Sequence, residues 1–162
     1  MPALRRVRML VLDVDGVLTD GRLFYGPRGE SLKAFHVRDG HGIKQVAAAG
    51  ITVAIISGRK SAAVARRARE LGIRHVIQGA RDKLAELNRL AKGRAVALEH
   101  CACVGDDTPD APMLQAAGLA IAVADAHADA LAAADLVTTR GGGRGAVREV
   151  CDWLLDARRM RT

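Results

Sequence analysis

The feature of this sequence that most limits its fold is a regular alternation of apolar segments with longer amphipathic ones. The segments Val7–Val14, Ile51–Ile56 and Cys101–Val104 are largely apolar, as expected of strands buried on both faces of a sheet. Shorter strands are predicted at His75–Ile77, Leu119–Val123 and Leu136–Thr138, and helices at Asp39–Ala49, Ser61–Leu71, Asp82–Ala91, Pro109–Ala117, Ala128–Ala134 and Ala146–Arg158. This alternation favours an α/β fold, a doubly wound parallel sheet with helices on both faces.

One segment departs from the alternation and predicts a small flap. Residues Gly21–Phe35 contain Gly26, Pro27 and Gly29 between short β-prone pieces, which is typical of a β-hairpin. The length of 162 residues is that of one domain, so we expect residues 1–162 to form a single unit.

Composition excludes several classes of protein. A hydrophobic fraction of 49% with 27% charged residues is typical of a globular chain. The longest apolar run is too short to cross a membrane, a strand begins too early for a signal peptide, and three cysteines make no disulfide framework. We therefore expect a cytoplasmic protein without membrane contact, in which Cys101 and Cys103 are buried apolar residues.

The basic charge bears on the partners of the protein. A formal net charge of +7 is compatible with nucleic-acid binding, but one Trp, one Tyr and two Phe supply no platform for stacking bases. The basic residues are also spread along the chain. We expect no nucleic acid, and a surface that attracts small anions.

Polar side chains follow the predicted strands at the points where those strands end. In such sheets the ligand lies outside the carboxyl ends of the strands. Because several separate segments bring such groups to one edge of the sheet, their convergence is stronger evidence for a functional site than any single residue. The residues concerned are Asp13 and Asp15 after the first strand, Ser57 and Arg59 after the second, and Asp106 and Asp107 after the strand that ends at Val104, with Lys83 at the start of a predicted helix.

These residue types suit phosphoryl transfer. Asp13 and Asp15 lie two apart, so an extended backbone points them the same way, and with Asp106 they form an oxygen cluster of the kind that Mg²⁺ prefers. One carboxylate can attack phosphorus and the other can protonate the leaving alcohol. Ser57 and Lys83 can bind the phosphoryl oxygens.

Four segments resemble the motifs of the haloacid dehalogenase superfamily of Mg²⁺-dependent phosphotransferases: DVDGVLTD (13–20), ISGR (56–59), Lys83 and GDDTPD (105–110). The resemblance implies that Asp13 is the nucleophile and Asp15 the general acid/base, and that Ser57 and Lys83 hold the phosphoryl group. It also implies that Asp13, Asp106 and the backbone carbonyl of Asp15 bind Mg²⁺, supported by Gly58, Asp107 and Asp110. The segments between the motifs are too short for the lid domains of that superfamily, so we expect neighbouring subunits to cover the site.

A further resemblance, running from about Val7 to about Leu155, is to the phosphatases of 3-deoxy-D-manno-octulosonate 8-phosphate. It rests on FHVRDG (35–40), GIK (42–44) and GGRGAVRE (142–149). Members are lidless tetramers that release phosphate from an eight-carbon sugar acid on the way to lipopolysaccharide. The resemblance implies a tetramer and a substrate-binding set of His36, Val37, Arg38, Asp39, Gly40, Lys44, Arg59, Arg67 and Lys83. Arginine suits such a substrate because it binds carboxylate and phosphate in bidentate fashion.

Other interpretations stay open at this point. The motifs do not separate the eight-carbon acid phosphate from a nine-carbon sialic-acid-type 9-phosphate. A catalytically silent binding or assembly domain is a second alternative. His36 could equally pack in the hairpin, and Arg59 and Arg67 could be solvated surface residues. Gly141–Gly145 lacks the Lys-Ser/Thr ending of a phosphate loop, so a turn or an interface segment is the better interpretation.

Overall fold

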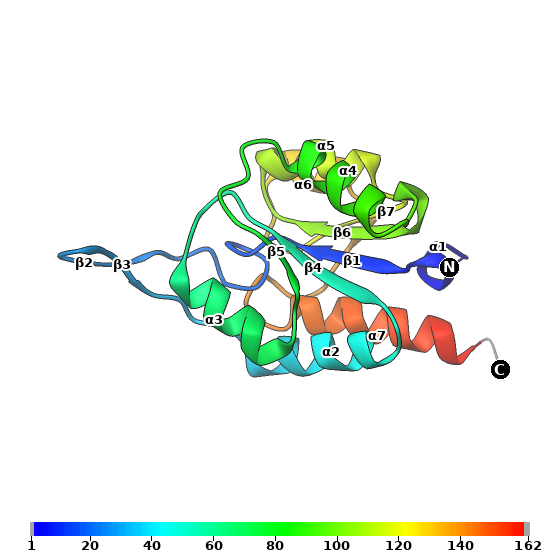
Figure 1. Cartoon of the computed structure of the whole chain (residues 1–162), viewed down its shortest axis with the longest axis horizontal. Coiled ribbons are helices and arrows are strands. Elements are labelled where there is room, and N and C mark those ends of the chain that lie inside the picture. Colours follow the sequence, from blue (N-terminus) through cyan, green and yellow to red (C-terminus); the bar gives the residue numbers. More distant parts are fainter. Residues whose placement is uncertain (1, 161–162) are drawn as a thin grey trace.

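The computed structural model describes residues 2–160 and contains a six-stranded parallel sheet between two layers of helices (Figure 1). The strands follow the spatial order β5-β4-β1-β6-β7-β8, and every neighbouring pair is parallel. Their bounds are β1 Met9–Leu12, β4 Thr52–Ile56, β5 His75–Ile77, β6 Cys101–Gly105, β7 Leu119–Ala122 and β8 Leu136–Val137. The predicted fold class is confirmed.

The central strand β1 shows why its sequence is apolar throughout. It pairs with β4 on one side and β6 on the other, with Leu12 opposite both Ile55 and Val104. Leu10 and Leu12 belong to the hydrophobic cluster on one face of the sheet, whereas Met9 and Val11 belong to the cluster on the other face. Because both faces are covered by helices, no position of the strand has to be polar.

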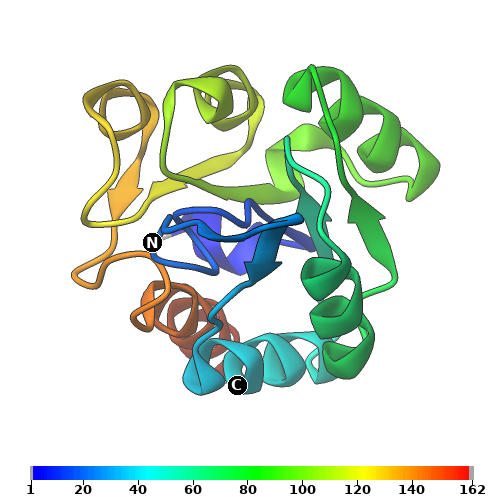
Figure 2. The same ribbon diagram turned by 90° about the vertical axis from the view of Figure 1, so that its left-hand side faces the viewer.

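The helices divide between the two faces as the alternation predicts. The helices α2 (Val37–Ala48), α3 (Ala62–Leu71) and α7 (Ala146–Arg159) cover one face, and α4 (Lys83–Gly93), α5 (Ala111–Ala116) and α6 (Ala128–Ala133) cover the other (Figures 1 and 2). Local signals set the ends: Asp82 caps α4 through the amide of Ala85, and Gly72 ends α3 with a positive φ of 73°.

Two helical features differ from the prediction. The expected helix at Pro109–Ala117 is divided into the 3₁₀ turn η2 (Thr108–Asp110) and α5, because Asp107 forms a capping box over the turn and its side chain accepts from the amide of Thr108. The short helix α1 (Pro2–Arg6) and the 3₁₀ turn η1 (Leu98–His100) were not expected.

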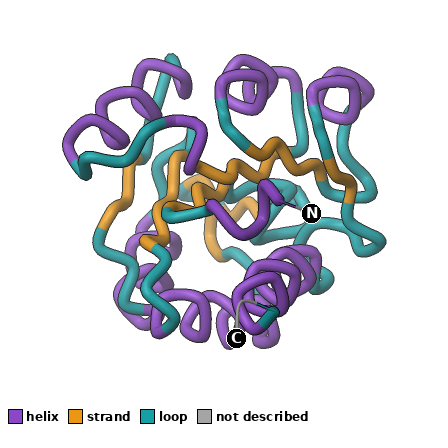
Figure 3. The backbone as a smooth tube through the Cα atoms, turned by 90° about the vertical axis from the view of Figure 1, so that its right-hand side faces the viewer, coloured by secondary structure: helices purple, strands orange, loops and turns teal. Residues whose placement is uncertain are grey.

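The predicted hairpin is present and projects from the body of the molecule (Figure 1). Its strands β2 (Phe24–Gly26) and β3 (Gly29–Leu32) are antiparallel. The helix α1 and the end of α7 lie on the opposite side of the molecule (Figures 1 and 3). Within residues 2–160, no helix is both long and apolar enough to span a membrane.

Candidate active site

The strand order changes direction at β1, and this opens a crevice at the carboxyl ends of β1 and its two neighbours, β4 and β6. The strands β4 and β5 extend the sheet to one side of β1, and β6 and β7 extend it to the other. Ligands of open α/β sheets bind at such a point. A cavity of about 800 Å³ lies there, and residues of all four sequence motifs line it: Asp13, Asp15, Ser57, Gly58, Arg59, Lys83, Asp106, Asp107 and Asp110.

A buried ion triad lies at the base of this cavity. The ammonium of Lys83, at the start of α4, lies 2.9 Å from Oδ1 of Asp13 and 2.5 Å from Oδ1 of Asp110. Burial by itself would lower the pKa of Lys83, but the charges of the two carboxylates outweigh burial, and the pKa is raised. Lys83 is therefore a fixed positive charge beside the Asp13 carboxylate.

Asp110 also shapes the loop that follows β6. Its Oδ2 accepts hydrogen bonds from the amides of Asp106 at 2.9 Å and Asp107 at 3.2 Å. A Cβ at Gly105 would lie 2.6 Å from the Cβ of Asp110, so the close approach requires glycine. With one oxygen on Lys83 and the other on the loop, Asp110 supports the site rather than offering a free ligand atom.

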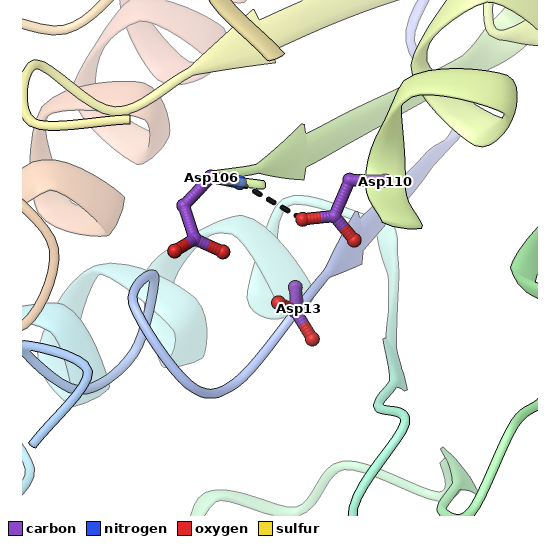
Figure 4. A group of neighbouring side chains, drawn as sticks. All are labelled: Asp13, Asp106 and Asp110. Carbon is purple, nitrogen blue, oxygen red and sulfur yellow. Dashed lines mark hydrogen bonds between the residues drawn. The ribbon is translucent and has the colours of Figure 1, made fainter. Parts of the chain in front are cut away.

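Three carboxylates converge at the ends of β1 and β6 (Figure 4). One oxygen from each of Asp13, Asp106 and Asp110 lies within 4.8 Å of the others. Burial, and then the negative charge of Asp110, raise the pKa of Asp13 to about 6, against the opposing effect of Lys83. Burial, and then the charges of Asp13 and Asp110, raise the pKa of Asp106 to about 8. A divalent cation relieves such mutual repulsion, so Asp13 and Asp106 fit as hard oxygen ligands of Mg²⁺, with Asp110 as the residue that supports them.

The Asp106 carboxylate lies directly against the backbone of the loop after β1. A Cβ at Gly16 would come within 1.9 Å of Oδ2 of Asp106, and Gly16 has a positive φ of 89°. Glycine is therefore required here both by conformation and by space. The two loops, far apart in sequence, are fitted to each other at the acidic cluster.

The carboxylate of Asp15, which the sequence placed in the cluster with Asp13 and Asp106, lies outside it and is held from the hairpin side. Its Oδ1 is 2.5 Å from Nζ of Lys33, and its Oδ2 is 3.8 Å from Nε of Arg59. Lys33 and Arg59 both contact Oε2 of Glu30, at 3.2 and 2.9 Å. Lys33 and Glu30 were missed by the sequence analysis, because a hairpin carries no chemical motif and only the folded chain brings it to Asp15.

Ser57 is held at the cavity wall by its main chain. It is buried, its amide donates to the carbonyl of Ile77 at 2.8 Å, and its carbonyl accepts from Ala80 at 3.0 Å. These bonds fix the turn after β4 and present the hydroxyl-bearing residue to the cavity.

The other residues of the predicted substrate-binding set are not brought to the cavity of this chain. The residues absent from its lining are His36, Val37, Arg38, Asp39, Gly40, Lys44 and Arg67. Val37 and Lys44 are exposed on α2, and His36 caps that helix by accepting from the amide of Arg38. Arg38 instead lines a second cavity of about 590 Å³, beside Arg140 and Arg148.

Two of these residues have packing roles in this chain. Asp39 is buried, which raises its pKa, and its Oδ1 accepts from the amide of Arg148 at 2.8 Å. Gly40 allows the side chain of Arg67 to pass, because a Cβ would lie 2.3 Å from Nη2 of Arg67. Arg67 also lies 6.0 Å from the ring centroid of Phe35 and 3.6 Å from Glu70.

Comparison with known proteins gives consistent matches. Residues 75–147 match the family of haloacid dehalogenase-like hydrolases. The 3-deoxy-D-manno-octulosonate 8-phosphate phosphatase of Escherichia coli BL21-DE3 is 51% identical over 155 residues, which cover 96% of this chain and 82% of that protein. The corresponding protein of Yersinia pestis is 48% identical, over 92% of this chain and 80% of its own length.

Solved structures agree with the sequence matches. The 3-deoxy-D-manno-octulosonate 8-phosphate phosphatase of Moraxella catarrhalis, crystallised with magnesium, phosphate and the sugar acid, superposes with a TM-score of 0.95 at 45% identity. The match covers 98% of this chain and 91% of that one. The cobalt-bound phosphatase of Haemophilus influenzae superposes with a TM-score of 0.94 at 44% identity, over 96% and 91% of the two chains.

Proposed function

Because the chain belongs to the family of 3-deoxy-D-manno-octulosonate 8-phosphate phosphatases, among the haloacid dehalogenase-like hydrolases, we propose that it hydrolyses this phosphate monoester. The products are the free eight-carbon sugar acid, a lipopolysaccharide precursor, and inorganic phosphate. The observation that carries the proposal is the Asp13–Lys83–Asp110 triad, with Asp106 beside it, at the base of an open cavity.

Asp13 is the nucleophile in this proposal. Its carboxylate attacks phosphorus, the new oxygen–phosphorus bond forms, and the bond to the sugar oxygen breaks, which leaves an aspartyl-phosphate. Lys83, 2.9 Å from Oδ1 of Asp13, favours the ionised carboxylate and offsets charge on the phosphoryl oxygens. Ser57, with Gly58 in the same turn, adds a hydrogen bond to those oxygens.

Asp15 moves the protons. It donates one to the leaving sugar oxygen and takes one from the water that then attacks the aspartyl-phosphate. Asp15 suits this role because it lines the same cavity as Asp13 but lies outside the Asp13–Asp106–Asp110 cluster. The two neighbouring aspartates are thereby held in different environments and have different tasks.

Mg²⁺ is the proposed cofactor. Asp13, Asp106 and the backbone carbonyl of Asp15 would hold the ion, while Asp110 and Asp107 order the loop that carries Asp106. When bound, the ion supplies positive charge that neutralises the carboxylates and the phosphate oxygens.

We also propose that the protein works in the cytoplasm as a homo-oligomer, a tetramer by analogy with its family. The cavity of one chain is open, and most of the predicted substrate-binding residues lie away from it. The hairpin also exposes apolar side chains: Leu23, Phe24, Tyr25 and Leu32. A subunit docked on this face would cover the apolar surface and add its own residues to the site; light scattering that finds only active monomers would contradict this.

A substrate panel tests the proposed activity. Purified protein is offered 3-deoxy-D-manno-octulosonate 8-phosphate, a nine-carbon sugar-acid 9-phosphate and simple sugar phosphates, with Mg²⁺ or with a chelator. We expect Mg²⁺-dependent phosphate release from the eight-carbon substrate, which the Asp13→Asn variant loses. Preference for the nine-carbon acid would keep the mechanism and change the substrate. Folded protein that releases no phosphate from any of them would contradict the proposal and favour a binding domain.

A further inference from the structure

The side chain of Lys33 is buried although the hairpin that carries it projects from the body of the protein. Only 1% of the side chain is exposed, and its ammonium lies 2.5 Å from Oδ1 of Asp15 and 3.2 Å from Oε2 of Glu30. A lysine that is buried to this extent needs counter-charges at such distances. The contacts are therefore specific, and they lead from the hairpin directly to Asp15.

A second cation completes this arrangement. Nη2 of Arg59 donates to Oε2 of Glu30 at 2.9 Å and to the hydroxyl oxygen of Tyr25 at 3.4 Å, while Nε of Arg59 lies 3.8 Å from Oδ2 of Asp15. Burial works to raise the pKa of Glu30, but hydrogen bonds from Arg59 and Lys33 outweigh it and lower the pKa. Two carboxylates and two cations thus connect the hairpin with the loops that follow β1 and β4.

We propose that Lys33 is a positioning residue that fixes the carboxylate of Asp15, so that the docked hairpin is part of the active site; this rests on the role of Asp15 in the proposed function. The ion pair occupies Oδ1 of Asp15. Oδ2 has the longer contact with Arg59, so we assign the exchange of protons with the leaving oxygen and with water to Oδ2.

The position of Asp15 explains why its carboxylate needs a positioning partner. Asp15 follows the end of β1 in a turn, and its carboxylate rotates about two side-chain bonds unless a partner holds it. Loss of correct orientation by about 1 Å costs about 100-fold in rate, which is similar to the contribution of general acid catalysis itself. Without Lys33, Glu30 and Asp15 also lose the charge that lies between them.

The alternative is that Lys33 only anchors the hairpin. An anchor would affect all substrates alike, whereas positioning of the general acid matters most for a poor leaving group. An aryl phosphate such as p-nitrophenyl phosphate needs no proton on its leaving oxygen, while a sugar alcohol does. The ratio of kcat/KM values for the two substrates therefore separates the two roles.

The test compares Lys33→Met with Lys33→Arg and with a matched control, Arg28→Met. Arg28 lies exposed at the turn of the same hairpin. We expect Lys33→Met to lower kcat/KM by about 100-fold for the sugar-acid phosphate and by less than about fivefold for p-nitrophenyl phosphate. Lys33→Arg restores the sugar-phosphate activity to within about tenfold of wild type, and Arg28→Met leaves both activities unchanged.

An equal fall for both substrates, or no fall, would overturn the proposal. If Lys33→Met melts below the assay temperature, the comparison moves to the Asp15→Asn background, measured with p-nitrophenyl phosphate below the melting point. In that background the proposal predicts that Lys33→Met causes no further fall in kcat/KM. If Lys33 only anchored the hairpin, Lys33→Met would still lower kcat/KM. Failure of the proposed function gives a different result. Wild type and Arg28→Met would then not hydrolyse the sugar-acid phosphate, and the effect of Lys33→Met would be measured on another alkyl phosphate that wild type hydrolyses.

Discussion

The raised pKa of Asp106 predicts that removing its charge stabilises the metal-free protein. In the folded state the pKa is about 8, against 3.8 for an unperturbed aspartate, because the carboxyl is buried beside Asp13 and Asp110. The folded protein therefore binds more protons than the unfolded chain between about pH 4 and pH 8, and stability is lost as pH rises through that window. Asp106→Asn removes the titrating carboxyl group and with it this loss of stability.

The size of the effect follows from the same values. At about 1.4 kcal/mol per pH unit, the difference corresponds to about 5 kcal/mol at pH 8. Because Asp106 is only partly buried, solvent screening reduces the effect to about 2–3 kcal/mol. For a chain of this length that corresponds to a rise in Tm of about 5–10 °C.

Thermal unfolding followed by circular dichroism, with a chelator present, measures this effect. At pH 8 we expect Asp106→Asn to melt above wild type, and at pH 5 the two should agree more closely, since Asp106 is then largely protonated. Glu99→Gln, at an exposed carboxylate, is the control and should show no such pH dependence. Added Mg²⁺ should stabilise wild type at pH 8 but not Asp106→Asn. A variant that melts at or below wild type at pH 8 would refute the reasoning.

Two further substitutions test other contacts of the site. Lys83→Met leaves Asp13 and Asp110 without their shared cation, so we expect a loss of about 3–5 kcal/mol in the free energy of unfolding, measured with urea at pH 8. The control Lys92→Met, on the exposed end of α4, should change the free energy of unfolding little. Equal stabilities of Lys83→Met and wild type would contradict the triad. Gly16→Ala displaces the Asp106 carboxylate and should weaken Mg²⁺ activation about 10–100-fold in a metal titration of activity. The control Gly50→Ala, at a similar φ of 82° with open space around it, should lower stability but leave the metal dependence of activity unchanged.

Patterns that are local in sequence predicted the fold and the centre of the site. A strand buried on both faces must be apolar throughout, so a strand could be predicted at Val7–Val14; the observed strand is the shorter Met9–Leu12, and Asp13 directly follows it. Parallel strands end at one edge, so Asp13, Ser57 and Asp106 could be expected together before any coordinates. The structure brings them to one cavity with Lys83.

Contacts that depend on how a flap docks could not be predicted in this way. The pairing of Lys33 with Asp15 depends on the path of the hairpin, which neither periodicity nor spacing describes. The same holds for Arg67, which passes over Gly40 instead of lining the cavity of its own chain. The catalytic and substrate-binding roles given to these residues stay predictions until variants are measured.

Detection of the phosphoenzyme tests the central claim most directly. Wild-type protein is mixed with 3-deoxy-D-manno-octulosonate 8-phosphate and Mg²⁺, quenched during the first turnover, and digested for mass spectrometry. We predict one phosphoryl group on the peptide that contains Asp13, and none in the Asp13→Asn variant. Phosphate release without any such adduct, or an adduct that persists in Asp13→Asn, would contradict the mechanism.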